Sequence, residues 1–419
     1  MKILWITNTI FPAPSKTLGI PAPVIGGWMY GLAMQIASVH GTHLAVATIY
    51  NGLEFKSLNI EGVTYYLIPS KITTSYRKKL KPIWEKVCNE FKPDVIHIHG
   101  TEYSHGLACM RACPSLNYIV SIQGMVGLIS IYYYEGINIR EILKHITFRD
   151  LVRFDTLFQA KKNFKRRGKF EKEYFQRTHH VIGRTSWDYV HVKALNQKVN
   201  YHFCNESLRD LFYTAEKWDI KNKSDYTIFL SQANLPFKGL HQVLKAVSRL
   251  KSEYRGIKIR IAGSSIIMYS SILDKIKLSG YGSYIRNLIK KLNLNEHVQF
   301  IGTLTEEQMV EEYKNAHLFI CPSSIENSPN SLGEAQLLGV PVVASYVGGI
   351  PDMVTHGETG LLYRFEEVEM LAGHIRSIFS NDNLAQKLSS NGIIIAEVRH
   401  NRVINLNKTL EIYQEIIAK

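Results

Sequence analysis

One short segment constrains the fold of this chain more than any other. Residues 317–322 are an apolar run of strand length, residues 323–328 form a short polar loop with one apolar residue, Ile325, and a helical pattern then continues to Gly339. Ser328 suits the N-cap of that helix, and Pro329 suits its first position because proline has no backbone N–H to leave unpaired. The order of strand, polar loop and helix predicts a parallel α/β unit, with ligand-binding loops at the carboxyl edge of its sheet.

The start of this helix is a candidate anion site. With Ser328 as the N-cap, the amides of Asn330, Ser331 and Leu332 have no partner inside the helix, and they lie at the positive end of its dipole. Backbone N–H groups in this position bind phosphate. We therefore expect these three amides to bind a phosphate group.

Two glutamates bracket the expected phosphate site. Glu334 lies one turn after Asn330 on the same helix face, and Glu326 lies in the preceding loop. A carboxylate repels phosphate but accepts hydrogen bonds from sugar hydroxyls, so the pattern favours a nucleotide-sugar. The alternative is that both glutamates are solvated surface residues.

The length and composition indicate a globular protein with two domains. A chain of 419 residues is too long for one ordinary core. Hydrophobic residues make up 45% of it and charged residues 21%, and it has no run of about eighteen apolar residues that would span a membrane. Residues 1–8 are typical of a first strand entering a polar loop rather than of a signal peptide, so we expect a cytoplasmic protein.

The cysteines and histidines give no evident metal site. His97 and His99 share one face of an expected strand, but no third ligand accompanies them, so we interpret them as structural histidines. An odd number of cysteines without paired spacing is typical of reduced, buried thiols. The five are Cys88, Cys109, Cys113, Cys204 and Cys321.

The formal net charge of +14 favours an anionic partner, and it is unevenly distributed. Residues 161–177 hold eight basic and two acidic side chains, a net +6, interleaved with four aromatic residues. This pattern suits an anionic membrane surface, as does the basic run at residues 77–81 before an amphipathic helix. The alternative is a solvated helix face. No nucleic-acid-binding signature accompanies the charge, so we expect no nucleic-acid partner.

Strands and helices alternate through both halves of the chain, which predicts two doubly wound α/β domains with parallel sheets, over residues 1–205 and 206–400. Lys238 follows the first strand of the second half, just ahead of a helical pattern that starts at Leu240. It is expected at the same sheet edge as Asn330, where its ammonium group can neutralise a diphosphate. The alternative is a solvated lysine.

The residues of the second half resemble the large retaining glycosyltransferase family 4, also called group 1. The likeness is carried by Glu326 and Glu334 with seven residues between them, by residues 339–344 and by residues 348–351. It extends to residues 238–239, 26–27 and 357–362, and so covers nearly the whole chain. The resemblance implies a GT-B fold, in which two Rossmann-like domains face each other across a cleft. The donor binds mainly in the second domain, and a last helix within residues 401–419 crosses back to the first.

The resemblance also implies roles for individual residues. Glu326 contacts the donor sugar as the catalytic residue, Glu334 the ribose hydroxyls and Lys238 the diphosphate. The amides of Asn330, Ser331 and Leu332 bind the distal phosphate. Gly26 and Gly27 approach the donor and acceptor from the first domain.

Two positions depart from the family pattern. The usual arginine five positions before the loop lysine is Ala233, so neutralisation of the diphosphate depends on Lys238, the helix dipole or another basic residue. The histidine often found after the strand at residues 118–122 is Gln123, which keeps a hydrogen-bond donor but does not titrate. We place Gln123 with Gly26 on the acceptor or donor side of the site.

We therefore predict a retaining glycosyltransferase of hexosyltransferase type. It moves a sugar from a UDP- or GDP-type nucleotide-sugar to a glycan or a polyprenyl-diphosphate-linked saccharide, in bacterial capsule, exopolysaccharide or O-antigen biosynthesis. The sequence has no DxD motif, so we expect no metal and no cofactor. From the basic and aromatic segments we expect peripheral contact with the inner face of the cell membrane. The alternatives are a GT-B-like epimerase or phosphorylase, or a non-catalytic basic nucleotide- or nucleic-acid-binding protein.

Overall fold

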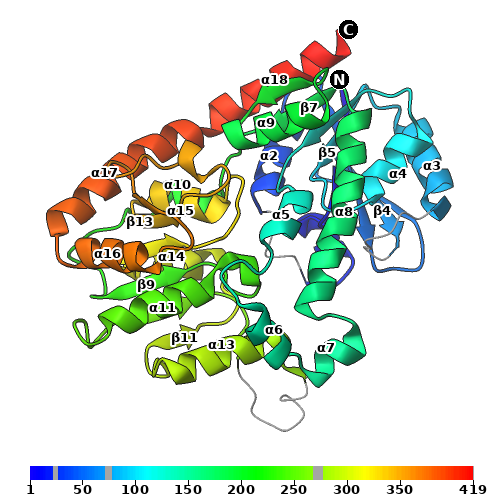
Figure 1. Cartoon of the computed structure of the whole chain (residues 1–419). Helices are drawn as coiled ribbons and strands as arrows, with labels where there is room; N and C mark the ends of the chain where they lie inside the picture. The colour runs from blue at the N-terminus through cyan, green and yellow to red at the C-terminus, as the bar shows by residue number, and fades with distance from the viewer. Residues whose placement is uncertain (22–26, 71–77, 268–276, 419) are drawn as a thin grey trace. The chain divides into compact units, whose positions relative to one another are not determined.

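The computed structural model describes residues 1–21, 27–70, 78–267 and 277–418. The chain forms two compact units, each with its own sheet (Figure 1). The first unit comprises Met1–Leu128, Asn163–Asp210 and His400–Lys419, and the second comprises Ile129–Lys162 and Leu211–Arg399. The predicted α/β class is confirmed, since each sheet is covered by helices that connect its strands.

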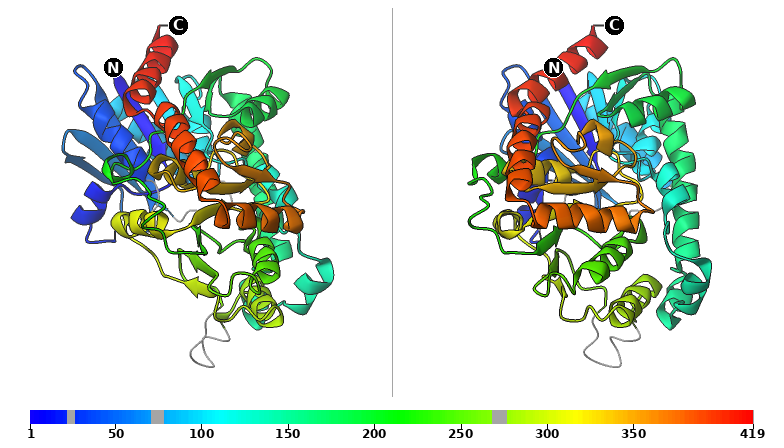
Figure 2. Two further views of the ribbon diagram at one scale, coloured as in Figure 1. Left: turned by 90° about the vertical axis from the view of Figure 1, so that its left-hand side faces the viewer. Right: turned by 60° about the vertical axis from the view of Figure 1, so that its left-hand side comes forward.

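The first unit contains an eight-stranded sheet with the order β3-β4-β2-β1-β5-β6-β7-β8. All neighbouring strands are parallel except β3, which pairs antiparallel with β4 at one edge. Figure 2 shows several of these strands side by side in blue and cyan. The strands are β1 (Lys2–Thr7), β2 (His43–Tyr50), β3 (Lys56–Ile60), β4 (Val63–Pro69), β5 (Val95–His99), β6 (Tyr118–Ser121), β7 (His180–Gly183) and β8 (Asn200–Phe203).

Two cores lie on opposite faces of this sheet. Trp84 of α3 and Phe175 of α8 are buried in one core, and Ile36 of α2 and Tyr413 of α18 in the other. Tyr413 is fixed by the indole N–H of Trp5, which donates to its hydroxyl over 2.9 Å. The helices are α1 (Pro12–Thr17), α2 (Gly27–Ala37), α3 (Lys81–Phe91), α4 (His105–Ala112), α8 (Leu157–Arg177), α9 (Ser186–Leu195) and α18 (Arg402–Ile417).

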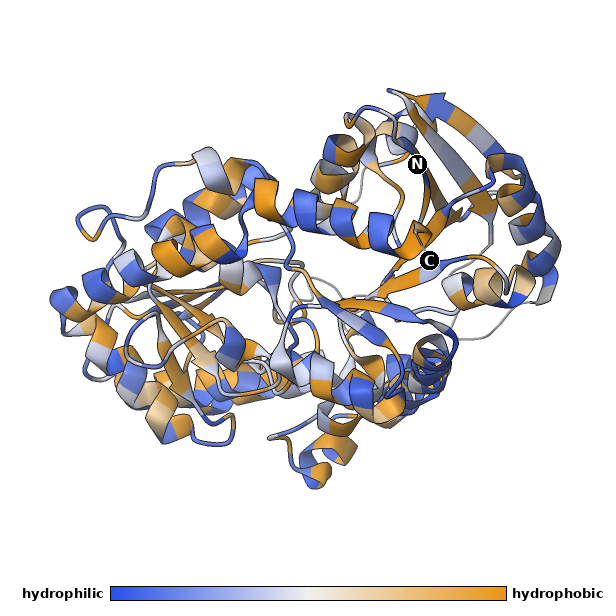
Figure 3. Cartoon of the chain, turned by 90° about the horizontal axis from the view of Figure 1, so that it is seen from above, coloured by the Kyte–Doolittle hydropathy of each residue, from blue (hydrophilic) through white to orange (hydrophobic). Residues whose placement is uncertain are grey.

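The second unit contains a six-stranded parallel sheet with the order β11-β10-β9-β12-β13-β14. Its central strands are buried throughout because helices cover both faces, and several strands are orange in the hydropathy view of Figure 3. The strands are β9 (Thr227–Leu230), β10 (Lys258–Ile261), β11 (Val298–Phe300), β12 (Leu318–Cys321), β13 (Val342–Ser345) and β14 (Leu361–Tyr363). The helices are α10 (Leu211–Thr214), α11 (Leu240–Leu250), α13 (Gly280–Lys291), α14 (Glu306–Asn315), α15 (Asn330–Leu338), α16 (Val368–Phe379) and α17 (Asp382–Arg399).

Residues 129–162, which the sequence-based boundaries place in the first domain, pack in the second unit instead. They hold the end of α5 (Val126–Tyr132), then α6 (Ile139–Lys144), α7 (Phe148–Arg153) and the start of α8. The backbone N–H of Gly280 donates to the Asp150 carboxylate over 2.8 Å, and the Tyr133 ring lies 5.9 Å from that of Phe237. Contacts between residues more than a hundred positions apart decide this placement, so local sequence patterns do not reveal it.

Candidate active site

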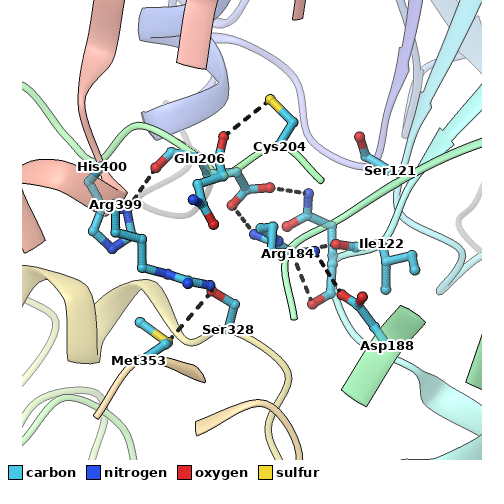
Figure 4. Close-up of polar contacts among 12 residues, drawn as sticks. Ser121, Ile122, Arg184, Asp188, Cys204, Glu206, Ser328, Met353, Arg399 and His400 are labelled. Atoms are coloured by element: carbon cyan, nitrogen blue, oxygen red, sulfur yellow. Dashed lines mark hydrogen bonds and ion pairs between the residues drawn. The ribbon is translucent and has the colours of Figure 1, made fainter. Parts of the chain in front are cut away.

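The candidate site lies at the carboxyl edge of the second sheet, where β12 leads into α15. The structure corrects the predicted start of this helix by one residue. Pro329 is the N-cap and Asn330 the first helical residue, so Ser328 is not the cap. The Ser328 hydroxyl is buried, lies 3.6 Å from the sulfur of Met353 and accepts a hydrogen bond from Arg399 over 3.2 Å (Figure 4). It is therefore turned toward the interior of the unit rather than toward the first helical amides.

This shift changes the hydrogen bonding of the first turn of the helix. The Leu332 N–H donates to the Pro329 carbonyl over 3.0 Å, which contradicts the expectation that it has no partner. Ser331 belongs to the first turn, whose amides have no carbonyl within the helix to pair with. Asn330 and Ser331 are also half-buried, whereas the helix from Leu332 onward is buried. The first two residues of α15 are thus its accessible end.

The structure brings together two residues that the sequence analysis treated separately. Lys238 ends the short helical turn Pro236–Lys238 after β9, and its Nζ lies 2.5 Å from Oε1 of Glu326 in the loop before α15. The two side chains are 19% and 14% exposed, so the pair is sheltered yet reachable. Neither residue is the solvated side chain of the alternative interpretation.

Two glycines allow the loops to close around this pair. Gly348 has φ +53, and a Cβ there would lie 1.8 Å from the Glu326 carbonyl oxygen, which accepts from the Gly349 N–H over 3.1 Å. Gly239 has φ +74, and a Cβ there would lie 1.8 Å from the Pro322 carbonyl oxygen. Larger residues at either position would push the loops apart.

The Ser323 hydroxyl fixes the position of the Glu326 carboxylate, and that carboxylate determines the protonation of Lys238. The Ser323 hydroxyl donates to Oε1 of Glu326 over 2.7 Å, which holds the carboxylate beside Lys238. Burial lowers the pKa of Lys238, but the Glu326 carboxylate outweighs this effect, so the pKa lies above its ordinary value. The ammonium group is therefore charged at neutral pH. Burial raises the pKa of the nearby Cys321 thiol to about 12, so Cys321 is no thiolate nucleophile.

Glu334 lies on α15, one turn after Asn330, as the sequence predicts. It is 5% exposed, which excludes the solvated surface position considered for it. Ala233, at the position of the family arginine, is also buried. Lys238 is the cation that contacts Glu326 among the described residues, and the guanidinium of Arg399 contacts Ser328.

The predicted residues of the first unit form a different arrangement. The side-chain amide of Gln123 donates to Oε1 of Glu206 over 2.8 Å, and Glu206 pairs with the buried Arg184 (Figure 4). Gly27 is the first residue of α2, whereas Gly26 lies outside the described residues. The sequence analysis missed Arg184, although an arginine directly after the strand His180–Gly183 is a signal that could have identified it.

The two histidines of β5 are buried, and their rings stack with centroids 3.8 Å apart. His97 fits the predicted structural role, since its ring nitrogens contact the Tyr413 hydroxyl at 2.5 Å and the Ser121 hydroxyl at 2.6 Å. His99 is buried and stacked as well, but neither of its ring nitrogens has a hydrogen-bond partner among the described residues, so the expectation that its hydrogen bonds are satisfied is wrong. Among the described residues, no group of three histidines, cysteines or carboxylates is arranged to hold a metal ion.

The basic segments form helices with one buried side. In α8, Tyr174 and Phe175 are buried in the core, so these two aromatic residues are not at a surface as expected, whereas Lys165 and Lys169 are exposed. In α3, Trp84 is fully buried. Within the described ranges, no helix combines the length and apolar character needed to cross a bilayer.

The part of the chain that contains the site is similar to a known protein family. Residues 213–394 match the family described as "Glycosyl transferases group 1", and this range contains Lys238, Glu326 and α15. The matched range lies within the second unit.

Two curated relatives align with part of the chain. The D-inositol 3-phosphate glycosyltransferase of Corynebacterium efficiens is 28% identical over 160 residues, which are 38% of this chain and 35% of the relative. The amylovoran biosynthesis glycosyltransferase AmsK of Erwinia amylovora is 28% identical over 144 residues, 32% of this chain and 35% of the relative. The match thus spans about a third of the length of each of these relatives.

Solved structures match the whole chain. Sucrose-phosphate synthase from Thermosynechococcus elongatus has a TM-score of 0.71 at 17% identity, with 100% of this chain and 99% of that chain covered. Anabaena HepE, solved in complex with UDP-glucose, has a TM-score of 0.63 at 15% identity, with 99% and 100% covered. At this identity the likeness shows the fold alone, and it confirms the predicted GT-B fold.

Proposed function

We propose that this protein is a retaining glycosyltransferase that takes a sugar from a UDP- or GDP-type nucleotide-sugar. The observation that carries the proposal is the ion pair of Lys238 and Glu326 beside the open end of α15, inside the range that matches the group 1 family. A cation, a carboxylate and first-turn amides at one sheet edge are what a sugar attached to a diphosphate requires. The likeness to HepE, which was solved with UDP-glucose, supports a nucleotide-sugar donor.

We assign the donor contacts within the second unit by chemistry. Lys238 neutralises the diphosphate, and the amides of Asn330 and Ser331 donate to it, whereas the Leu332 amide is already bonded to Pro329. Glu334 accepts from the ribose hydroxyls and Glu326 from the donor sugar. Arg399 adds a second positive charge behind the start of α15, through its contact with Ser328.

Donor binding must change the ion pair. A diphosphate that approaches Lys238 competes with Glu326 for the same ammonium group, and lysine exchanges partners readily because its charge sits on a flexible stem. In the structure Glu326 holds Lys238 charged and in place. When the diphosphate takes over Lys238, the carboxylate becomes available to the sugar.

The transfer step then requires the positive charge of Lys238 and the negative charge of Glu326. The bond from the anomeric carbon to the phosphate oxygen breaks while a bond to the acceptor hydroxyl forms on the same face, and the leaving phosphate oxygen takes the acceptor's proton. Lys238 and the amides stabilise the departing diphosphate, and Glu326 stabilises the positive charge that develops on the sugar. Because lysine supplies this charge, we propose that turnover needs no divalent metal, so that EDTA leaves it unchanged.

The proposed acceptor is a glycan or a polyprenyl-diphosphate-linked saccharide of bacterial surface polysaccharide. The similarity to AmsK, named for amylovoran biosynthesis, supports the polysaccharide setting. The exposed lysines of α8 support contact with an anionic lipid surface, where such a carrier would lie.

A thermal-shift panel of UDP- and GDP-sugars tests the donor, because a ligand that binds the folded state raises Tm without any acceptor. The donor that shifts Tm is then supplied with and without a lipid-linked saccharide while release of nucleoside diphosphate is measured. Acceptor-dependent release supports a transferase. Rearrangement or release of sugar without an acceptor would favour an epimerase or phosphorylase, and binding without any reaction would leave a non-catalytic binding protein.

A further inference from the structure

Six large apolar side chains are exposed on α6, on α7 and at the residue that follows α7. Their exposed fractions run from 56% to 75%, although large apolar residues are usually buried. We call this set the α6–α7 surface. Its members are Ile139, Leu143, Phe148, Leu151, Val152 and Phe154.

The opposite side of the same helices is fixed to the second unit, so the α6–α7 surface is not part of a loose loop. Asp150 accepts from the Gly280 N–H over 2.8 Å, and His145 contacts the Ser283 hydroxyl at 3.0 Å. Ile137 and Ile142 are buried. The segment thus has an inner side that packs on α13 (Figure 1) and an outer apolar side that is largely exposed in the part of the chain that the structure describes.

Phe154 combines high exposure with an unfavourable backbone conformation. It follows α7 with φ +51, a left-handed conformation that is unfavourable for a residue with a bulky side chain. Its ring is the most exposed of the six, at 75%.

On α6, α7 and the two residues that follow, cations outnumber carboxylates by four to three. Arg140, Lys144 and Arg153 are exposed on the same two helices. The carboxylates of Asp150 and Asp155 share one cation, Arg149, at 3.1 Å, and Glu141 lies 3.5 Å from His145. Exposed phenylalanine and leucine side chains with arginine and lysine beside them match the interface of an anionic bilayer, with apolar groups below the headgroups and cations among them.

We propose that the α6–α7 surface docks on an anionic membrane and inserts its apolar side chains at the level of the headgroups. The choice of a membrane as the partner rests in part on the proposed function, because a lipid-linked acceptor is met at the bilayer. The exposed apolar side chains and the exposed cations support it independently. The docking element belongs to the unit that carries the Lys238–Glu326 pair.

Vesicle sedimentation with the full-length protein tests this proposal. We expect binding to mixed phosphatidylglycerol and phosphatidylcholine vesicles, and much weaker binding to phosphatidylcholine alone. The double variant Leu151→Glu/Phe154→Glu should bind the mixed vesicles at least about tenfold more weakly, because two inserted side chains become charged. A matched control is Leu53→Glu, since Leu53 is 99% exposed in the first unit, and its binding should stay within about twofold of wild type.

A second variant tests the electrostatic part. The double variant Lys144→Glu/Arg153→Glu should bind the mixed vesicles more weakly than wild type. Its remaining binding should depend less on the salt concentration. Unchanged Tm and unchanged UDP shifts in the thermal assay would show that all variants are folded. Wild-type vesicle binding by Leu151→Glu/Phe154→Glu, or an equal loss in Leu53→Glu, would overturn the proposal. So would a wild-type dimer that this double variant converts to a monomer, because the surface would then bind a second copy.

The outcome of the vesicle experiment can be distinguished from the outcome of the test of the proposed function. Vesicle binding that depends on the α6–α7 surface, without any sugar transfer, would leave the docking surface standing and remove the transferase. Transfer to an acceptor without any vesicle binding would do the reverse.

Discussion

Each of the two sheets has an ion pair in the loops that follow its strands. The two pairs differ in how far their side chains are buried and in how many hydrogen-bond acceptors the cation contacts. Arg184 follows β7 and pairs with Glu206, with side chains 3% and 9% exposed. Lys238 follows β9 and pairs with Glu326, with side chains 19% and 14% exposed. The Arg184 guanidinium also donates to the carbonyls of Ile122 and Gln123.

The comparison shows how similar charges take different roles. The planar guanidinium of Arg184 is held by a carboxylate and two carbonyls, so it cannot change partners without losing several hydrogen bonds. The ammonium of Lys238 has one carboxylate partner and lies where a ligand can reach it. The first pair therefore fixes its loops, whereas the second pair is suited to exchange a carboxylate for a phosphate. Four predictions test this distinction.

The largest expected effect is the loss of stability when Glu206 is removed from the buried Arg184–Glu206 pair. Glu206→Ala leaves the Arg184 charge buried without its carboxylate, so the free energy of unfolding should fall by about 3–5 kcal/mol. Urea denaturation of the full chain measures it. The matched control Asp210→Asn removes the more exposed Arg402–Asp210 pair of the same unit and should cost less than about 1 kcal/mol. Equal losses in both variants would show that burial does not distinguish the two pairs.

Removing Glu326, the carboxylate of the Lys238–Glu326 pair, should lower turnover rather than stability. Glu326→Ala should lower kcat by about a hundredfold or more, since it removes stabilisation of the developing positive charge, while UDP affinity falls less. Steady-state kinetics and UDP titration separate these effects. Glu369→Ala, which removes an exposed partner of Arg249, is the control. Near-normal kcat in Glu326→Ala would contradict the assigned role.

Removing the cation should weaken recognition of the diphosphate. Lys238→Ala should lower UDP affinity by about tenfold and UMP affinity by less, because a diphosphate carries more negative charge for the ammonium to neutralise. Calorimetric titration of both nucleotides measures the ratio. Lys314→Ala, on α14 with exposed glutamate partners, should leave the ratio unchanged. A ratio unaffected by Lys238→Ala would mean that the diphosphate binds elsewhere.

The smallest effect concerns pH. Burial lowers the pKa of His97 to about 3, below the ordinary value of 6.5, so the unfolded chain binds a proton that the folded chain does not. Stability is therefore lost as pH falls below about 6.5, by less than about 1 kcal/mol for this one histidine at pH 6. His97→Gln should reduce the change in Tm between pH 7 and pH 6. Lys238→Ala should not, because Glu326 keeps the pKa of Lys238 above its ordinary value and the lysine stays charged at both pH values.

Much of the second unit is predictable from the sequence, because the signals are local. The strand before Glu326, the helix that ends at Gly339 and the position of Lys238 after a strand all follow from patterns within a few residues. The start of α15 was missed by one residue because the Ser328 hydroxyl contacts Met353 and Arg399, and these tertiary contacts override its local preference for the N-cap.

The first unit was less predictable at its candidate residues. Gln123 was identified by resemblance, but its partner Glu206 lies 83 residues away in the sequence, and no local pattern links them. The aromatic residues of α8 alternate with lysines in the sequence, and only the packing of that helix shows that Tyr174 and Phe175 are core residues.

The sequence alone determined that the chain alternates strands and helices in two halves, and that Lys238, Glu326 and the start of α15 lie at one sheet edge. Periodicity, helix ends and turn residues are sufficient for this because they act over one or two turns of chain. Only the tertiary structure decided that Lys238 and Glu326, 88 residues apart, form an ion pair, and that residues 129–162 pack in the second unit. Such contacts depend on how whole elements pack, and the local sequence does not specify which distant surface each element will meet.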